Sequence, residues 1–103
     1  MLSGSEESNL VRAAAEGDGP AFARLYEAYE RPIFNYVLRL LGDRHEAEDA
    51  TQEAFIKAYR ALPAFRGDSA FYTWLYRIGI NTAKNYLMAM GRRAPTTTEV
   101  EAE

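Results

Sequence analysis

Aromatic rings and cations are concentrated in residues 65–93, which makes this stretch the first candidate for a binding function. It opens with a polar loop around Gly67 and continues as a helical pattern that carries four large rings: Phe71, Tyr72, Trp74 and Tyr76. Rings of this kind stack on the face of any unpaired base, while Arg and Lys neutralise the phosphates beside it. The composition therefore indicates a surface for unpaired nucleic acid.

Four polar residues recur along this helical pattern at spacings of four, four and three: Thr73, Arg77, Asn81 and Lys84. This spacing places them on one stripe, where the cations suit phosphates and the Asn amide suits base edges. A solvated helix face needs similar residues, so the stripe alone leaves both interpretations open. The adjacent loop, residues 65–69, has short polar side chains that can form a pocket for an extruded base, and this favours nucleic acid.

The four rings differ in their expected roles. Phe71 falls on the apolar side of the helix, so we expect it in the core. Tyr72 and Tyr76 are expected to point away from that side, which makes them the better candidates for stacking on a base. Trp74 lies at the flank, where a core position and a contact with a base both stay open.

A second stripe lies on the preceding helical segment and surrounds one apolar residue with polar ones: Asp49, Gln52, Glu53, Ile56 and Arg60. A central apolar anchor with a charged rim suits a helix-on-helix protein interface. A solvated helix face remains the alternative, because the pattern alone fits both.

Catalysis and metal binding find little support in the sequence. The chain has no cysteine and one histidine, His45, which argues against a zinc or di-iron centre. Carboxylates gather between residues 46 and 53, but no histidine or second acidic cluster pairs with them for acid–base work. The glycine turn at residues 17–19 lacks the lysine and the strand of a phosphate-binding loop. We expect no enzyme, no cofactor and no metal.

Length and composition fit one globular domain of 103 residues, with 48% hydrophobic and 26% charged residues. No apolar run approaches the ~20 residues of a membrane span. The first residues also lack the basic and apolar segments of a signal peptide. We therefore expect no membrane insertion and a cytoplasmic location.

Charge is unevenly distributed along the chain, although the net charge is only −3. Residues 1–55 hold five Arg against eleven Asp or Glu, a balance of −6, and residues 56–95 hold seven Lys or Arg against one Asp, a balance of +6. Such asymmetry indicates two surfaces for partners of different sign. Segregation of charge by helix, without functional meaning, is the alternative.

Helical spacing dominates and strand-like alternation is absent, so we predict an all-α fold, a compact bundle of about four helices. The predicted helices cover residues 6–16, 20–41, 43–62 and 70–90. Glycines and Pro63 end the first three. Pro32 is expected to kink the second helix or to divide it, and Asp68 or Ser69 to cap the fourth.

Apolar spacing also predicts which residues face the core. In the second helix these are Phe22, Leu25, Tyr26, Tyr29, Ile33, Phe34, Val37, Leu40 and Leu41. In the third helix they are Ala47, Thr51, Ala54, Phe55, Ala58 and Leu62.

Two stretches, DATQEAFIKAYRAL and FRGDSAFYTWLYRIGINTAKNYL, resemble region two of bacterial extracytoplasmic-function (ECF) sigma factors. The opening half, LVRAAAEGDGPAFARLYEAYERPIFNYVLRLLGD, is similar to the first helices of the same domain. The resemblance covers residues 9–93, and residues 52–87 are closest to envelope-stress members of the group. It implies a transcription initiation factor domain rather than an enzyme.

The resemblance implies two sites. The helix with the D-x-x-Q-E pattern would bind the clamp helices of the polymerase beta-prime subunit through Asp49, Gln52 and Glu53, with Ile56 and Arg60 further along. The melted non-template strand of the minus-ten promoter element would place a flipped base in a pocket made by Phe65, Arg66, Gly67, Asp68, Ser69 and Ala70. Further DNA contacts are expected from Tyr72, Trp74, Tyr76, Arg77, Asn81, Lys84, Asn85, Arg92 and Arg93.

One departure from the family pattern concerns the domains. ECF sigma factors carry a second promoter-binding domain, and this sequence has none after its paired arginines. We expect a region-two domain over residues 1–94 and an acidic linker or frayed tail over residues 95–103. An anti-sigma regulator is a further expected partner. The rival hypothesis is a protein-interaction module held by such a regulator, with no DNA contact of its own.

Overall fold

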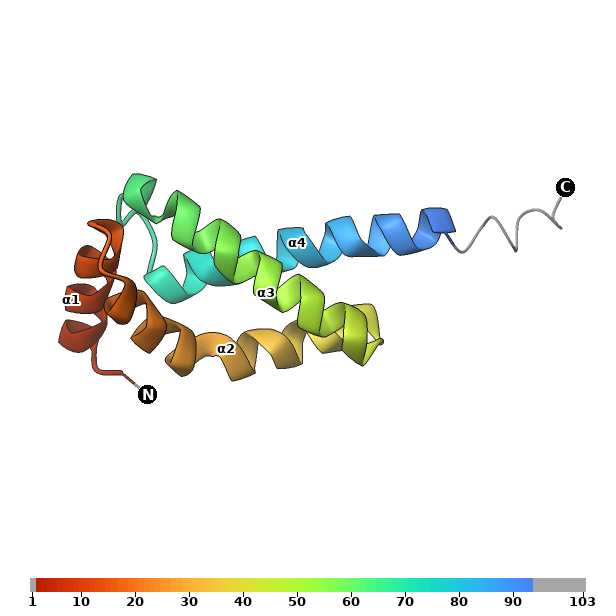
Figure 1. Cartoon of the computed structure of the whole chain (residues 1–103), viewed down its shortest axis with the longest axis horizontal. Coiled ribbons are helices and arrows are strands. Elements are labelled where there is room, and N and C mark those ends of the chain that lie inside the picture. Colours follow the sequence, from red (N-terminus) through yellow and green to blue (C-terminus); the bar gives the residue numbers. More distant parts are fainter. Residues whose placement is uncertain (1, 94–103) are drawn as a thin grey trace, which may run out of the picture.

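The computed structural model describes residues 2–93, and the side chains of residues 2–91. Residues 2–93 contain no strand, only four α-helices and a short 3-10 turn: α1 (Gly4–Ala15), α2 (Gly19–Leu41), α3 (Arg44–Ala61), η1 (Leu62–Ala64) and α4 (Phe71–Arg93). Figure 1 shows α2, α3 and α4 packed lengthwise, with α1 across one end. The prediction of an all-α bundle of about four helices is confirmed.

Side-chain caps set where the first three helices begin. Ser3 and Glu6 form a reciprocal capping box, so α1 starts at Gly4 rather than at the predicted Glu6. Asp18 accepts a hydrogen bond from the N–H of Ala21 at 3.1 Å and caps α2. Asp43 accepts from the N–H of Glu46 at 2.9 Å and caps α3, as its position before the helix predicts.

α2 continues through Pro32 from Gly19 to Leu41, which excludes the predicted division of this segment into two helices, and the alternative of a kink stays a prediction. A proline inside a helix removes one backbone hydrogen bond and costs ~3 kcal/mol. Burial offsets this cost, because Tyr29, Ile33 and Val37 on both sides of the proline are only 4%, 2% and 1% exposed. Tertiary packing thus overrides a local helix breaker.

Small side chains on α3 let it lie against both of the other long helices. Ala47, Ala50, Ala54 and Ala58 are fully buried, and three of them belong to the same core cluster as the larger residues Ile33 of α2 and Leu75 of α4. All six residues predicted for the inner side of this helix are buried. On α2 the prediction fails at Leu40, which is 37% exposed near the end of the helix.

The loop of residues 65–70 joins η1 to α4 without regular secondary structure. Gly67 adopts a φ of +80°, a left-handed conformation that favours glycine. Because α4 begins at Phe71, its cap position is Ala70, which has no side-chain oxygen, and the predicted cap at Asp68 or Ser69 is wrong. The Ser69 hydroxyl instead donates to the carbonyl of Ala70 at 3.3 Å.

Candidate nucleic-acid interface

The loop and the first turns of α4 form a pocket of about 440 Å³ that is open to solvent. It is lined by Ala64, Phe65, Arg66, Asp68, Ser69, Trp74 and Arg77. Four of these residues belong to the loop that the sequence predicts for a flipped base, and two more, Trp74 and Arg77, belong to the other predicted DNA contacts. The structure therefore brings the polar loop and the first cations of α4 together around one hollow.

Two rings form the apolar wall of this pocket. The ring centroids of Phe65 and Trp74 lie 4.9 Å apart, and Phe71 packs behind them at 6.1 Å from Phe65 and 5.7 Å from Trp74. Phe71 is 4% exposed and belongs to the core, as predicted. Trp74 is half-buried. It packs against the core and also lines the pocket, so the core position and the surface position that the sequence left open are both partly occupied.

Polar residues continue from the pocket along α4. Thr73, Arg77, Asn81 and Lys84 are all exposed, as their common stripe predicts, and Asn85 is exposed as well. Arg66 and Asp68 are exposed on the loop. Exposed cations and amides thus lie beside the pocket, where they can contact phosphates and base edges. The side chains of Arg92 and Arg93, and the acidic tail, lie outside the described residues.

Tyr72 and Tyr76 are not brought to the pocket. Tyr72 contacts Tyr29 of α2 at 5.3 Å between ring centroids, and Tyr76 contacts Tyr36 of α2 at 5.6 Å. Tyr76 is half-buried, contrary to the expectation that it points away from the packed side. Burial and the neighbouring Tyr72 hydroxyl raise the pKa of Tyr76 to about 12. These two rings therefore stabilise the α2–α4 contact, and their predicted stacking on bases stays a prediction.

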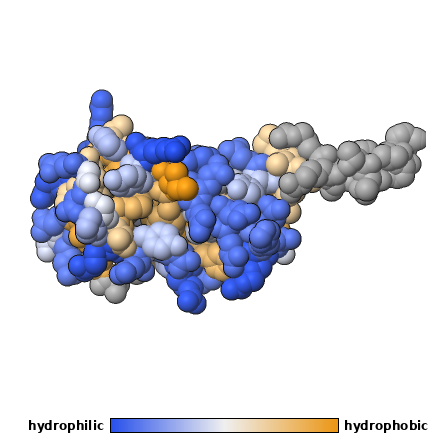
Figure 2. Space-filling model, in the orientation of Figure 1, coloured by the Kyte–Doolittle hydropathy of each residue, from blue (hydrophilic) through white to orange (hydrophobic). Residues whose placement is uncertain are grey.

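The second predicted surface lies on α3. Asp49, Gln52 and Arg60 are exposed, and Ile56 is 52% exposed, which is unusual for an isoleucine on a helix. Glu53 differs, because its carboxylate accepts a hydrogen bond from the Tyr86 hydroxyl at 3.1 Å and pairs with Lys57 at 3.2 Å. In Figure 2, hydrophobic residues stand out among hydrophilic ones on the side of the molecule where α3 lies.

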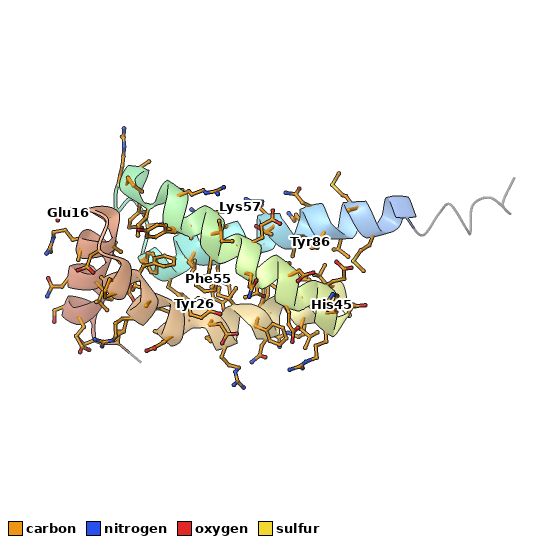
Figure 3. The ribbon with its side chains drawn as sticks, viewed as in Figure 1. Glu16, Tyr26, His45, Phe55, Lys57 and Tyr86 are labelled. Atoms are coloured by element: carbon orange, nitrogen blue, oxygen red, sulfur yellow. The ribbon has the colours of Figure 1, made fainter. Side chains whose placement is uncertain are left out.

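An apolar groove runs beside this stripe, between α3 and the first half of α2. Its volume is about 580 Å³, and it is lined by Gly19, Phe22, Tyr26, Gln52, Phe55, Ile56, Tyr59 and Arg60. Figure 3 shows Tyr26 and Phe55 meeting between the two helices, and their ring centroids are 4.8 Å apart. The groove thus extends the α3 stripe onto α2.

A family model described as Sigma-70 region 2 matches residues 25–93. The chain belongs to the sigma-70 region 2 family. Curated relatives include the RNA polymerase sigma-H factor of Pseudomonas aeruginosa, 54% identical over 103 residues, and the ECF RNA polymerase sigma-E factor of Escherichia coli, 53% identical over 96 residues. These alignments cover 100% and 91% of the chain and 53% and 50% of the relatives, so the chain spans about half their length.

A solved structure shares this sigma region 2 fold. It is the NMR structure of an engineered region 2 of sigmaE in complex with GTAAAA, with a TM-score of 0.79 and 45% sequence identity. The match covers 89% of this chain and 97% of that one. Together with the names of the relatives, it confirms the resemblance to region two of ECF sigma factors.

Five lining residues of the groove in this sigma region 2 domain were not singled out from the sequence as surface residues: Gly19, Phe22, Tyr26, Phe55 and Tyr59. Phe22 and Tyr26 were assigned to the core face, because their spacing matches it, and both are partly buried beside the groove. Tyr59 carried a usable signal, since it stands three residues after Ile56 on the exposed side of the helix. It is 40% exposed.

Within residues 2–93 of the sigma region 2 domain, no group of three or more His, Asp or Glu residues could hold a metal ion. No helix in the same part of the chain is long and apolar enough to cross a membrane.

Proposed function

We propose that this domain couples core RNA polymerase to promoter DNA, holding the melted non-template strand of the minus-ten element with one base flipped into the pocket. The single observation that carries this proposal is the pocket itself, with its ring wall of Phe65 and Trp74 and its rim of Arg66 and Arg77. Its volume of about 440 Å³ lies in the ~300–1,000 Å³ range of small-ligand sites. The role involves binding and no covalent step.

Stacking and charge would divide the work of strand binding. Base–ring stacking contributes ~1–3 kcal/mol per base without regard to sequence, and Trp74 is the half-buried ring of the pocket wall that can supply it. Arg77 and Lys84 would neutralise phosphates, and Asn81 would read a base edge. Because the domain would bind single strands better than duplex, it shifts the melting equilibrium toward the open state. The GTAAAA named for the structural neighbour supports a DNA strand as ligand.

Polymerase is the proposed partner of the α3 surface. Asp49, Gln52 and Ile56 present an apolar anchor with a polar rim, as a helix-on-helix contact needs. We assign this surface to the clamp helices of the beta-prime subunit, and the names of the relatives as polymerase sigma factors support the assignment. A cytoplasmic location follows from such a partner.

The test compares the parent with Asn81→Ala in binding to single-stranded GTAAAA and to six strands that each carry one changed base. Loss of a base-reading amide is expected to cost ~1–3 kcal/mol at one position and to relax the preference there. Asn35→Ala, an exposed amide on α2, is the matched control and should leave the preference unchanged. An equal loss of affinity on all seven strands would contradict the role given to Asn81.

The second candidate is a protein-interaction module held by an anti-sigma regulator, without DNA binding of its own. The apolar groove beside Ile56 favours a helical protein partner. The same titration separates the two functions, because this candidate requires that the folded parent ignore GTAAAA and every strand derived from it.

A further inference from the structure

We propose that Glu7 and Tyr29 position the base pocket: their hydrogen bond fixes the ring of Phe71, and that ring holds Phe65 and Trp74 together as the wall against which a base lies. The inference rests on the proposed function, because it concerns the pocket assigned to the flipped base. Neither Glu7 nor Tyr29 lines this pocket. Both are positioning residues that act through other rings.

Tyr29 is anchored by its hydroxyl as well as by its burial. It is 4% exposed in α2, and its hydroxyl donates a hydrogen bond to the carboxylate of Glu7 on α1, 22 residues earlier in the chain. Burial first, and then this hydrogen bond, raise the pKa of Tyr29 well above its ordinary value. The hydroxyl therefore keeps its proton and remains the donor.

The ring of Tyr29 touches the start of α4. Its centroid lies 5.9 Å from that of Phe71 and 5.3 Å from that of Tyr72, the first two residues of the helix. Phe71 in turn contacts both wall residues of the pocket, Phe65 at 6.1 Å and Trp74 at 5.7 Å. A continuous series of ring contacts thus leads from α1 to the pocket wall.

The loop needs such a support from outside. Residues 65–70 form no helix or strand, and the cap position of α4 is Ala70, which offers no side-chain oxygen to the first N–H groups. Ring contacts therefore hold the two sides of the loop together. α1 also packs against η1, and the last residue of η1, Ala64, lines the pocket. α1 is thus connected to the pocket in two ways, through the bond of Glu7 to Tyr29 and through η1.

Removal of the hydroxyl should affect base binding more than phosphate binding. Tyr29→Phe keeps the ring and its volume but frees it from Glu7, so the Phe71 ring behind the wall loses its fixed neighbour. The wall formed by Phe65 and Trp74 is then less firmly held, and a base that lies against it loses contact. Arg77 and Lys84 stay exposed on α4, so their attraction for phosphates remains.

The experiment titrates the whole chain with single-stranded GTAAAA and with six strands that each carry one abasic position. The ratio of the Kd of the most damaging abasic strand to the Kd of GTAAAA measures how much the pocket uses its base. We expect this ratio to fall about fivefold in Tyr29→Phe and in Glu7→Ala, the factor of one hydrogen bond. Tyr36→Phe, whose ring contacts Tyr76 rather than Phe71, and Ser8→Ala on α1 should keep the parent ratio.

The ratio separates positioning from stability. A variant that is merely less folded loses affinity for intact and abasic strands by the same factor, and its ratio does not move. Unchanged ratios in both Tyr29→Phe and Glu7→Ala would overturn the inference and leave the proposed function standing. A folded parent that binds no strand, or that binds all seven equally, would overturn the base pocket itself and the inference with it.

Discussion

Glu53 shows how one side chain can belong to a predicted surface and to the fold at the same time. The D-x-x-Q-E pattern assigns it to the polymerase surface together with Gln52. The structure also ties its carboxylate to Tyr86 of α4 at 3.1 Å and to Lys57 at 3.2 Å. Burial, then the hydrogen bond from this hydroxyl to Glu53, raise the pKa of Tyr86. A variant at Glu53 therefore changes the α3–α4 contact as well as the surface.

Thr51 is a buried residue whose hydroxyl makes no hydrogen bond in the described part of the chain. It is 3% exposed, and its Oγ1 has no hydrogen-bond partner among the described residues. Since an unpaired buried hydroxyl costs ~1–3 kcal/mol, Thr51→Val should raise the free energy of unfolding by about 1 kcal/mol. Urea unfolding followed by circular dichroism measures this change.

Thr82 provides the matched control for this prediction. It is also buried, at 1% exposure, but its hydroxyl donates to the carbonyl of Ile78 at 2.8 Å. Thr82→Val should therefore lower the free energy of unfolding by about 1 kcal/mol. If both substitutions shift stability in the same direction, the difference in hydrogen bonding does not decide the outcome.

At the scale of elements, the sequence predicts helices and their inner faces well, because caps and spacing are local signals. Asp43 and Gly42 mark a boundary whatever surrounds them, and the period of α3 predicts five of its six buried residues, all but Ala50. The failures arise where a neighbour decides. Burial keeps α2 whole at Pro32, and the contact with Tyr36 turns Tyr76 toward α2, which no local pattern contains.

The candidate site divides in the same way. The pocket loop and the α4 stripe were predictable from residue types, because polar loops and cations are legible in sequence. The groove was not, since it is formed jointly by Phe22 and Tyr26 of α2 and by residues of α3 that lie about 30 positions later. The role of Glu7 was equally hidden, because its partner Tyr29 lies 22 residues away.

The contact between α2 and α4 passes over Gly79 and gives a prediction for the element. A Cβ at this position would lie 3.4 Å from Cγ2 of Ile33, an ordinary contact distance. Alanine favours a helix over glycine by ~1 kcal/mol, so Gly79→Ala should stabilise the domain by about 0.5–1 kcal/mol in thermal unfolding. Gly79→Val adds two methyl groups against Ile33 and should destabilise it. A loss of stability with alanine would mean that the two helices leave no room there.

At the scale of the whole molecule, the two proposed surfaces use different elements and different charges. The acidic half of the chain, with a balance of −6 up to residue 55, includes the first part of the α3 stripe, and the basic half carries the pocket and the α4 stripe. Figure 1 shows that α3 crosses α4, and the hydrogen bond between Tyr86 and Glu53 joins the two helices. The two proposed surfaces therefore lie on two helices that are joined directly.

The most direct test of this account is binding of the chain to a clamp-helix fragment of the beta-prime subunit from Escherichia coli core polymerase. The informative variant is Gln52→Ala with Ile56→Ala, because both side chains are exposed and the contacts of Glu53 stay intact. Arg44→Ala with Glu48→Ala is the control, since it removes both members of an exposed ion pair on the same helix. The account predicts that the parent and the control bind the fragment and that the Gln52–Ile56 variant loses at least about tenfold in affinity, or ~1.4 kcal/mol. A folded parent that does not bind, or a variant that binds as well as the parent, would contradict the coupling of polymerase to promoter through α3.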